Sequence, residues 1–257
     1  MEVACELGNP VRPRGALACL RDRASFHLLL AIFCLASLAW SQLAGLLFTL
    51  LPRREGAALG RFVIMAGCRA GLALMRLAGL ARFDLAALDA LPARGPAVIA
   101  CNHLSLLDAV LVLSRLPDAV CIAKAELWDN PFLGGSIRLA GYIRNDAALA
   151  LIRAASRALR EGRQLVIFPE GTRSAGQGLG PFKPGFAAMA KMARVPVQSV
   201  FLSSNTPYLR RGWLLWRRPD FPLAYRARSG RRIMVEGDIS ATAAAIEHYF
   251  VEEISRA

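Results

Sequence analysis

The sequence predicts an α/β domain with a mixed sheet flanked by helices, preceded by an N-terminal helical membrane-anchoring motif. Near the start of the chain, a long run of residues carries no charge. From residue 96 onward, short β-branched runs alternate with helical stretches at the spacing of βαβ units. With 257 residues, 55% of them hydrophobic, the chain is too long and too apolar for a disulfide mini-protein or a disordered tail.

The composition limits the classes of partner. Basic residues outnumber acidic residues by 32 to 19, which gives a formal net charge of +13 and favours anionic partners: a nucleic acid, a lipid surface or a phosphorylated substrate. Nucleic-acid binding is disfavoured because the sequence has no RNP, zinc-finger or helix-turn-helix signature. The 6 cysteines form no C-x-x-C pair and no Cys/His cluster, which predicts no metal site and no disulfide framework and is typical of a reducing compartment.

The first predicted element is an apolar helix. Residues 1–24 are polar and basic, and the run from Leu28 to Leu51 then carries no charge. At about 1.5 Å per residue, a helix of this length crosses a bilayer core of about 30 Å, and the run is too long for a signal peptide. Its orientation is left open by four arginines on each side, namely Arg12, Arg14, Arg21 and Arg23 before it and Arg53, Arg54, Arg61 and Arg69 after it.

A second helix is predicted from Ala57 to Phe83. Four arginines fall within an arc of about 140° on this otherwise apolar stretch: Arg61, Arg69, Arg76 and Arg82. We expect this basic stripe to face lipid headgroups, with a core helix that has one solvated face as the alternative. The chain is thus predicted to divide into a basic segment at 1–24, membrane-associating helices at 25–83 and a folded domain at 84–257.

The folded domain is predicted to alternate strands and helices. The strands are Ala97 to Cys101, Ala119 to Ala123, Gln164 to Phe168 and Val197 to Leu202, and the helices are Leu106 to Leu116, Ala147 to Glu161 and Gly185 to Arg194. Two later runs, Pro222 to Arg228 and Arg231 to Glu236, flank Ser229-Gly230 and predict a β-hairpin. A closing helix begins at Ala241.

A histidine follows the first strand of this domain, where α/β folds place reacting groups. His103 and Asp108 are separated by a spacing that would place them about 140° apart on one straight helix. We therefore expect His103 to precede the helix and Asp108 to accept a hydrogen bond from its imidazole within the first turn, which gives an oriented general base. The alternative is a capping box formed by Ser105 and Asp108. Cys101, at the end of an apolar strand, is predicted to be a buried and unreactive thiol.

A charged, glycine-containing loop follows the strand that ends at Phe168. In this loop Gly171 permits close backbone approach, Thr172 offers a hydroxyl, and Arg173 has paired N–H donors for a phosphate or carboxylate. These residues predict a ligand-facing loop. A solvated turn in which Glu170 and Arg173 are incidental is the alternative.

Two other glycine-containing segments are assigned no chemistry. The segment from Gly134 to Arg138 lacks the closing glycine of a G-x-S-x-G nucleophile elbow, which disfavours a serine hydrolase. The G-x-G-x-G at 176–180 has neither a dinucleotide fingerprint nor a P-loop Lys-Ser/Thr, so we expect a flexible loop.

Two sequence blocks stand out: N-H-x-S-x-x-D from Asn102 to Asp108, and F-P-E-G-T-R-S from Phe168 to Ser174. With these blocks, residues 96 to 202 resemble the glycerolipid acyltransferase family, which includes the 1-acylglycerol-3-phosphate acyltransferases. The apolar strand that this family opens with Val-Pro is matched at Val195 to Val197. Two strong blocks in the right order about 65 residues apart are a specific signal.

One family block departs from its usual pattern. In the stretch from Gly141 to Asp146, Arg144 stands earlier than the family's arginine. The stretch from Lys124 to Leu127 is similar to the family's K-x-E-L, with Lys124 at the end of a strand on the edge that carries His103. The resemblance implies that Lys124 and Arg144 contact the substrate.

The resemblance implies an acyltransferase that moves a fatty acyl group from acyl-CoA or acyl carrier protein to the hydroxyl of a lysophospholipid. His103 is then the base, Asp108 orients it, and the loop from Glu170 to Arg173 holds the acceptor. Lysophosphatidic acid, giving phosphatidic acid, is the implied acceptor, with lyso-ornithine lipid and lysophosphatidylethanolamine as alternatives. No metal or organic cofactor is expected. The implied location is the inner (cytoplasmic) membrane with the catalytic domain facing the cytoplasm, and the alternative from another class is a non-catalytic basic membrane-binding protein.

Overall fold

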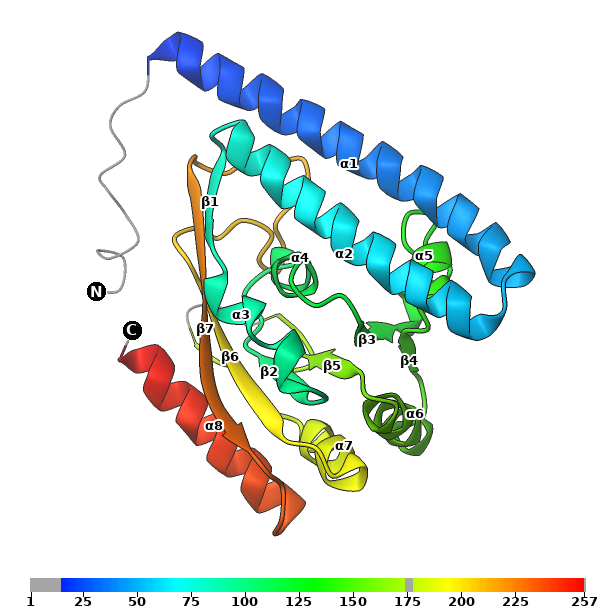
Figure 1. The fold of residues 1–257 in the computed structure, drawn as a ribbon. Coiled ribbons are helices and arrows are strands. Elements are labelled where there is room, and N and C mark those ends of the chain that lie inside the picture. Colours follow the sequence, from blue (N-terminus) through cyan, green and yellow to red (C-terminus); the bar gives the residue numbers. More distant parts are fainter. Residues whose placement is uncertain (1–14, 174–177, 257) are drawn as a thin grey trace.

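A seven-stranded sheet between two layers of helices forms the centre of the protein in the computed structural model, which describes residues 15–173 and 178–256 (Figure 1). The strand order is β1-β7-β6-β2-β5-β3-β4. The strands are β1 (Ala81–Asp84), β2 (Val98–Cys101), β3 (Ala119–Lys124), β4 (Ile143–Asn145), β5 (Gln164–Ile167), β6 (Val197–Ser204) and β7 (Leu223–Ile233). Thus the predicted mixed sheet is confirmed.

The strand directions place four loops together. Strands β6, β2, β5, β3 and β4 run parallel, whereas β7 is antiparallel to β6 and parallel to β1. The chain therefore leaves β2, β3, β5 and β6 at one edge of the sheet, which we call the carboxyl edge. Loops at this edge of a parallel sheet are where α/β proteins bind ligands.

Alternating residues of β2 show why both sheet faces are covered. Ile99 and Cys101 pack into one apolar core with residues of α2 and α4, whereas Val98 and Ala100 pack into a second core with residues of α6, α7 and α8. A strand buried on both faces reads as a continuous apolar run, as this one does. The helices are α1 (Ala16–Leu50), α2 (Arg53–Leu77), α3 (Ala86–Asp89), α4 (Leu107–Leu113), α5 (Gly134–Leu139), α6 (Ala148–Arg160), α7 (Gly185–Ala193) and α8 (Ile239–Ser255), with short 3-10 turns at Pro92–Arg94 and Ala125–Trp128.

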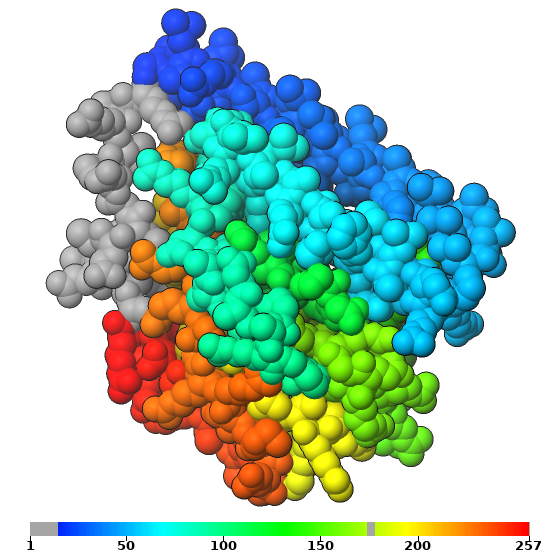
Figure 2. Space-filling view, viewed as in Figure 1, coloured from blue at the N-terminus to red at the C-terminus, as the bar shows by residue number. Residues whose placement is uncertain are grey.

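The two N-terminal helices lie side by side along the domain and form a continuous band on its surface (Figures 1 and 2). Both are long and apolar enough to cross a membrane by length and composition. The outer surface of α1 carries large exposed apolar side chains, including Leu17, Leu20, Leu28, Ile32, Phe33, Leu35, Leu43, Leu46, Phe48 and Leu50. These apolar helices suggest membrane association.

Glycines bring the two helices close to the domain. A Cβ atom at Gly135 in α5 would lie 1.8 Å from the carbonyl oxygen of Ser41 in α1. A Cβ atom at Gly60 in α2 would lie 2.6 Å from the backbone nitrogen of Ala140. The Gly135 N–H also donates a hydrogen bond to Ser41 Oγ at 3.1 Å. The absence of side chains at these crossings therefore sets how closely α1 and α2, which we call the anchor helices for their predicted role, pack on the domain.

The prediction that four arginines form one basic stripe on the second helix is wrong. Helix α2 ends at Leu77, Gly79 adopts a positive φ of 71°, and Arg82 lies in β1. Arg61 is buried and faces the domain, where its guanidinium donates to Asp118 at 2.5 Å and to the Ala140 carbonyl at 3.0 Å. The stripe does not form because the helix ends before Arg82, and because Arg61 turns inward to pair with the exposed Asp118 and with the carbonyl of the buried Ala140.

The predicted hairpin is also wrong, because residues 223–233 form the single strand β7. Gly230 occupies the middle of this strand, and a Cβ atom there would lie 2.5 Å from the Phe201 ring and 2.9 Å from the Tyr249 hydroxyl. The pairing register with β6 shifts between Gln198 and Val200, opposite this part of β7. Gly230 therefore serves close packing beside a strand irregularity rather than a turn.

Candidate active site

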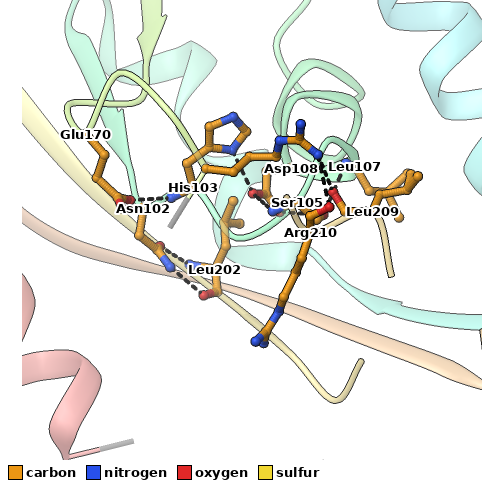
Figure 3. Close-up of polar contacts among 10 residues, drawn as sticks. Asn102, His103, Ser105, Leu107, Asp108, Glu170, Leu202, Leu209 and Arg210 are labelled. Carbon is orange, nitrogen blue, oxygen red and sulfur yellow. Dashed lines mark hydrogen bonds and ion pairs between the residues drawn. The ribbon is translucent and has the colours of Figure 1, made fainter. Parts of the chain in front are cut away.

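His103 and Asp108 come together at the carboxyl edge of the sheet. His103 follows the central strand β2, and Asp108 lies in the first turn of α4. Nδ1 of the imidazole is 3.0 Å from Oδ2 of Asp108, whose side chain is completely buried (Figure 3). A carboxylate at this nitrogen fixes the tautomer and stabilises the imidazolium form.

The capping interaction and the imidazole pair exist together. Besides facing His103, Asp108 accepts hydrogen bonds from the Ser105 backbone N–H at 2.6 Å and from the Ser105 hydroxyl at 3.2 Å. Ser105 Oγ in turn accepts from the Leu107 N–H at 3.1 Å. The two interpretations of this motif are therefore not alternatives: the same carboxylate closes the turn and orients the histidine.

Glu170 contacts the backbone of His103 rather than its imidazole ring. Its carboxylate is only 4% exposed and accepts hydrogen bonds from the His103 backbone N–H and from the Gly180 N–H, both at 2.8 Å (Figure 3). The sequence predicts a substrate-binding role for Glu170. In the structure its carboxylate joins the loop after β2 to the loop after β5, and substrate binding by Glu170 stays a prediction.

Two further residues, whose roles do not follow from the sequence alone, fix the histidine. Asn102 receives a hydrogen bond from the Leu202 N–H at 2.7 Å and donates one to the Leu202 carbonyl at 2.9 Å, so it holds the end of β2 against β6. The ring of Phe168 stacks on the imidazole with centroids 4.0 Å apart. Both residues belong to the recognised blocks, and their place at the ends of β2 and β5 is the signal that indicates them.

The other residues of the charged loop after β5 are Gly171, Thr172 and Arg173. Arg173 donates from one guanidinium nitrogen to the carbonyls of Leu209 at 2.9 Å and Arg210 at 3.1 Å, so part of the predicted phosphate fork is used within the protein. Gly171 has a positive φ of 70°, and a Cβ atom there would lie 2.9 Å from Lys183 Nζ. Lys183 is thus an additional cation at this loop, and no motif in the sequence indicates it. Thr172 is exposed, and Ser174 lies outside the described residues.

Lys124 and Arg144 lie on the neighbouring strands. Lys124 ends β3 at the carboxyl edge, as the sequence predicts, and its side chain is exposed. Arg144 in β4 pairs with Asp146 at 3.0 Å and lies over the Trp128 ring at 5.9 Å from its centroid. Neither side chain has a contact with His103 or Asp108 among the interactions found in the described residues, so substrate binding by these two cations stays a prediction.

The thiol of Cys101 is buried and unreactive, as the sequence predicts. Cys101 is completely buried, and burial followed by the charge of Asp108 raises the pKa of its thiol well above the ordinary value. A protonated, inaccessible thiol neither attacks a substrate nor binds a metal. Within residues 15–173 and 178–256, no group of three or more His, Cys, Asp or Glu side chains forms a metal site.

Comparisons with known proteins agree with the sequence motifs. Residues 82–203 match the family model described as Acyltransferase. The chain is 36% identical over 129 residues to a 1-acyl-sn-glycerol-3-phosphate acyltransferase of Cocos nucifera, 34% over 150 residues to one of Helicobacter pylori, and 29% over 194 residues to one of Pseudomonas aeruginosa. These alignments cover 48%, 55% and 73% of this chain and 40%, 59% and 73% of the respective relatives.

The fold also has a solved counterpart. The 1-acyl-sn-glycerophosphate acyltransferase PlsC of Thermotoga maritima superimposes with a TM-score of 0.67 at 18% identity, over 92% of this chain and 95% of that one. At this identity the likeness concerns the fold alone. The two matched blocks, the Acyltransferase family model over residues 82–203 and the named relatives therefore make this part of the chain similar to the 1-acyl-sn-glycerol-3-phosphate acyltransferases.

Proposed function

We propose that this protein transfers an acyl group from an acyl thioester to the free hydroxyl of a lysophospholipid. The observation that carries this proposal is the pair formed by His103 and the buried Asp108 at the carboxyl edge of the sheet. A thioester is already activated, so the reaction needs a base for the acceptor hydroxyl and does not need a protein nucleophile.

In the proposed step, Nε2 of His103 takes the proton of the acceptor hydroxyl as the hydroxyl oxygen attacks the thioester carbonyl carbon. The tetrahedral intermediate then collapses, the C–S bond breaks, and the departing thiolate takes the proton from the imidazolium. Asp108 stabilises the imidazolium while it exists, as the carboxylate of a catalytic triad does. Here the acceptor hydroxyl occupies the place of the serine.

The acceptor we propose is 1-acyl-sn-glycerol 3-phosphate, which gives phosphatidic acid. Support comes from the names of the relatives and from the cations at the carboxyl edge: Arg173 and Lys183 at the loop after β5 and Lys124 at the end of β3. A phosphate with its negative charges fits such a group of donors. Either acyl-CoA or acyl carrier protein serves as the donor in this proposal.

We further propose that α1 and α2 lie in the plane of the inner membrane with the active site on the cytoplasmic side, where the thioester donor is found. Phe26 packs on Tyr208 and Phe221, while Ser41 meets Gly135, so at least about 22 Å of α1 lies against the domain. A helix held in this way is poorly placed to cross the bilayer. Residues 84–257 would then act as the catalytic unit and residues 25–83 as its anchor.

The test measures free-thiol release by the purified full-length protein with acyl-CoA or acyl carrier protein and a panel of acceptors: lysophosphatidic acid, lysophosphatidylethanolamine, lyso-ornithine lipid and glycerol 3-phosphate. We expect the highest rate with lysophosphatidic acid. His103→Ala is expected to lower the rate about 10²–10⁴-fold. The matched control is His248→Ala, since His248 is an exposed residue of α8 paired with Glu252.

The outcomes separate the proposals. A higher rate with another lyso-lipid would replace the acceptor but keep acyl transfer. Near-normal thiol release by His103→Ala would overturn the mechanism. Vesicle binding without transfer to any acceptor would favour the non-catalytic membrane-binding protein.

A further inference from the structure

An arginine-flanked apolar segment lies between β6 and β7. Residues 210–218 read Arg-Arg-Gly-Trp-Leu-Leu-Trp-Arg-Arg. The side chains at its centre are strongly exposed, with relative values of 54% for Leu214, 41% for Leu215 and 66% for Trp216. Arg211, Arg217 and Arg218 are also exposed. Consecutive exposed leucine and tryptophan residues are unusual on a surface that faces only water.

The segment is directly attached to the candidate active site. It follows β6 at the carboxyl edge of the sheet, the edge that carries His103. Leu209, just before it, accepts hydrogen bonds from the Leu106 N–H at 3.2 Å and from Arg173 at 2.9 Å, and Arg210 also accepts from Arg173 (Figure 3). The position of the segment is therefore fixed relative to the loop that carries Arg173.

The segment also borders the anchor helices. Tyr208 and Phe221, which flank it in the sequence, both pack on the ring of Phe26 in α1. The apolar surface of α1 and the exposed side chains of the segment are thus linked by a shared aromatic contact. This continuity distinguishes the segment from an isolated surface loop.

Internal contacts hold the segment so that its apolar residues point outward. The Trp213 indole N–H donates to the Arg217 carbonyl at 2.8 Å, and the Arg217 guanidinium lies 4.6 Å from the centroid of the Trp213 ring. The Arg217 N–H closes a turn on the Leu214 carbonyl at 3.0 Å. The turn between Trp213 and Arg217 therefore presents Leu214, Leu215 and Trp216 together at its tip.

We propose that residues 211–218, which we call the docking segment, insert into the surface of an anionic bilayer beside the active site. The three apolar residues of its tip would enter the interface, while Arg211, Arg217 and Arg218 would contact lipid phosphates. This arrangement places the segment where a lysophospholipid leaves the bilayer for the catalytic histidine, and to that extent it rests on the proposed function. An acidic carrier protein would match the arginines, but the exposed Leu-Leu-Trp tip and its link to α1 favour a lipid surface.

The first measurement needs no catalytic activity. Vesicles of phosphatidylglycerol that contain brominated acyl chains quench tryptophan fluorescence only on contact with the apolar layer. We expect quenching of the wild-type protein to exceed that of Trp216→Phe, because the variant lacks the tryptophan at the tip. Equal quenching of the two proteins would overturn the proposal.

The second measurement compares lysophosphatidic acid embedded in phosphatidylglycerol vesicles with a short-chain lysophosphatidic acid dissolved as monomers. At about fivefold per arginine on anionic lipid, Arg217→Glu combined with Arg218→Glu is expected to lower the rate on vesicles by at least about tenfold. The rate on the dissolved acceptor is expected to stay unchanged. Leu214→Ser combined with Leu215→Ser is expected to give the same selective loss, through the apolar contribution.

Matched controls are Arg153→Glu with Arg157→Glu on α6, and Met192→Ser at the end of α7, all exposed and remote from the carboxyl edge. Both controls are expected to retain the rate on vesicles. Equal loss on both acceptors would overturn the proposal and assign the segment to the catalytic core. Loss confined to reactions with acyl carrier protein as the donor would also overturn it, in favour of a protein dock. If the wild type acylates neither acceptor, the proposed function fails, while the quenching result still decides whether the segment docks.

Discussion

The imidazole of His103 is placed by side chains that act on different parts of the same residue. Asp108 faces its Nδ1 atom, Glu170 holds its backbone N–H, and Asn102 fixes the chain just before it to β6. Each of these partners is itself buried. Catalysis by a positioned base depends on such placement, because a shift of about 1 Å costs about 10²-fold in rate.

Glu170→Gln separates a positioning role from substrate binding. A glutamine side chain offers one carbonyl oxygen and one amide NH₂ group, so one of the two backbone N–H groups loses its acceptor. We expect kcat to fall about 10–100-fold while the acceptor KM stays within about twofold. Steady-state kinetics on the dissolved short-chain acceptor check this, with the exposed Glu161→Gln as a matched control. A raised acceptor KM at constant kcat would show instead that Glu170 contacts the acceptor.

The sequence predicts the catalytic pair, His103 and Asp108, better than it predicts the contacts that hold the pair in place. His103 and Asp108 are five positions apart, so their approach follows from one turn of local structure. Glu170 is 67 positions from His103 in the sequence, and the pairing of β2 with β5 brings the two residues together. Without knowledge of that pairing, a carboxylate in a loop is expected to be exposed. Lys183 is not predicted for the same reason, because its approach to Gly171 depends on the path of the chain after the loop.

Among the elements, the short helix α5 joins the anchor to the domain. Gly135 leaves room for the backbone of α1 at Ser41, and Gly60 of α2 leaves room for the backbone at Ala140. Small residues at a crossing allow helix backbones to approach closely, in the same manner as in membrane helix pairs. The anchor helices are thus fixed by backbone contact as well as by apolar burial.

Gly135→Ala is expected to destabilise the protein by about 1–3 kcal/mol, because the new methyl group overlaps the Ser41 carbonyl and forces α1 outward. Thermal unfolding in detergent would measure this as a lower Tm. Gly67→Ala in α2 is the matched control, since a Cβ atom there has open space, and its Tm is expected to stay equal or rise. Equal Tm values for Gly135→Ala and the wild type would show that α1 shifts freely on the domain.

The sequence predicts correctly those helices and strands that are long enough to show a pattern of apolar residues. The strands β2, β3, β5 and β6 and the helices α4, α6 and α7 lie where the sequence places them, within a few residues. The edge strands β1 and β4 have only four and three residues and carry no readable alternation. The sequence predicts two strands in place of β7 because Ser229-Gly230 has turn composition, whereas Gly230 is explained by its packing against Phe201 and Tyr249.

In the whole molecule, the proposed boundary between the anchor and the catalytic unit does not coincide with a gap between structural elements. The predicted division between residues 83 and 84 falls within β1, which pairs with β7 at the edge of the sheet. It would also remove the α2 residues that cover α4 and α5. Composition changes sharply at the start of the apolar run but not here, so the sequence could not locate this boundary from charge or hydropathy.

A chain shortened to begin at residue 84 is therefore expected to aggregate, because it exposes the β7 edge and the apolar surface beneath α2. Size-exclusion chromatography with and without detergent checks this, and the full-length chain in the same detergent is the control. A monomeric, active product would establish residues 84–257 as an independent catalytic domain.

The position of β2 between β6 and β5 has a consequence for local opening of the fold. Amide hydrogens of interior strands exchange with solvent only when most of a domain unfolds, whereas peripheral segments open at little cost in free energy. His103 and its supporting carboxylates therefore lie in the part of the molecule that opens last. The docking segment, in the connection between β6 and β7, lies at the periphery, so its brief local opening would loosen the hold on lipid while the geometry around the imidazole persists.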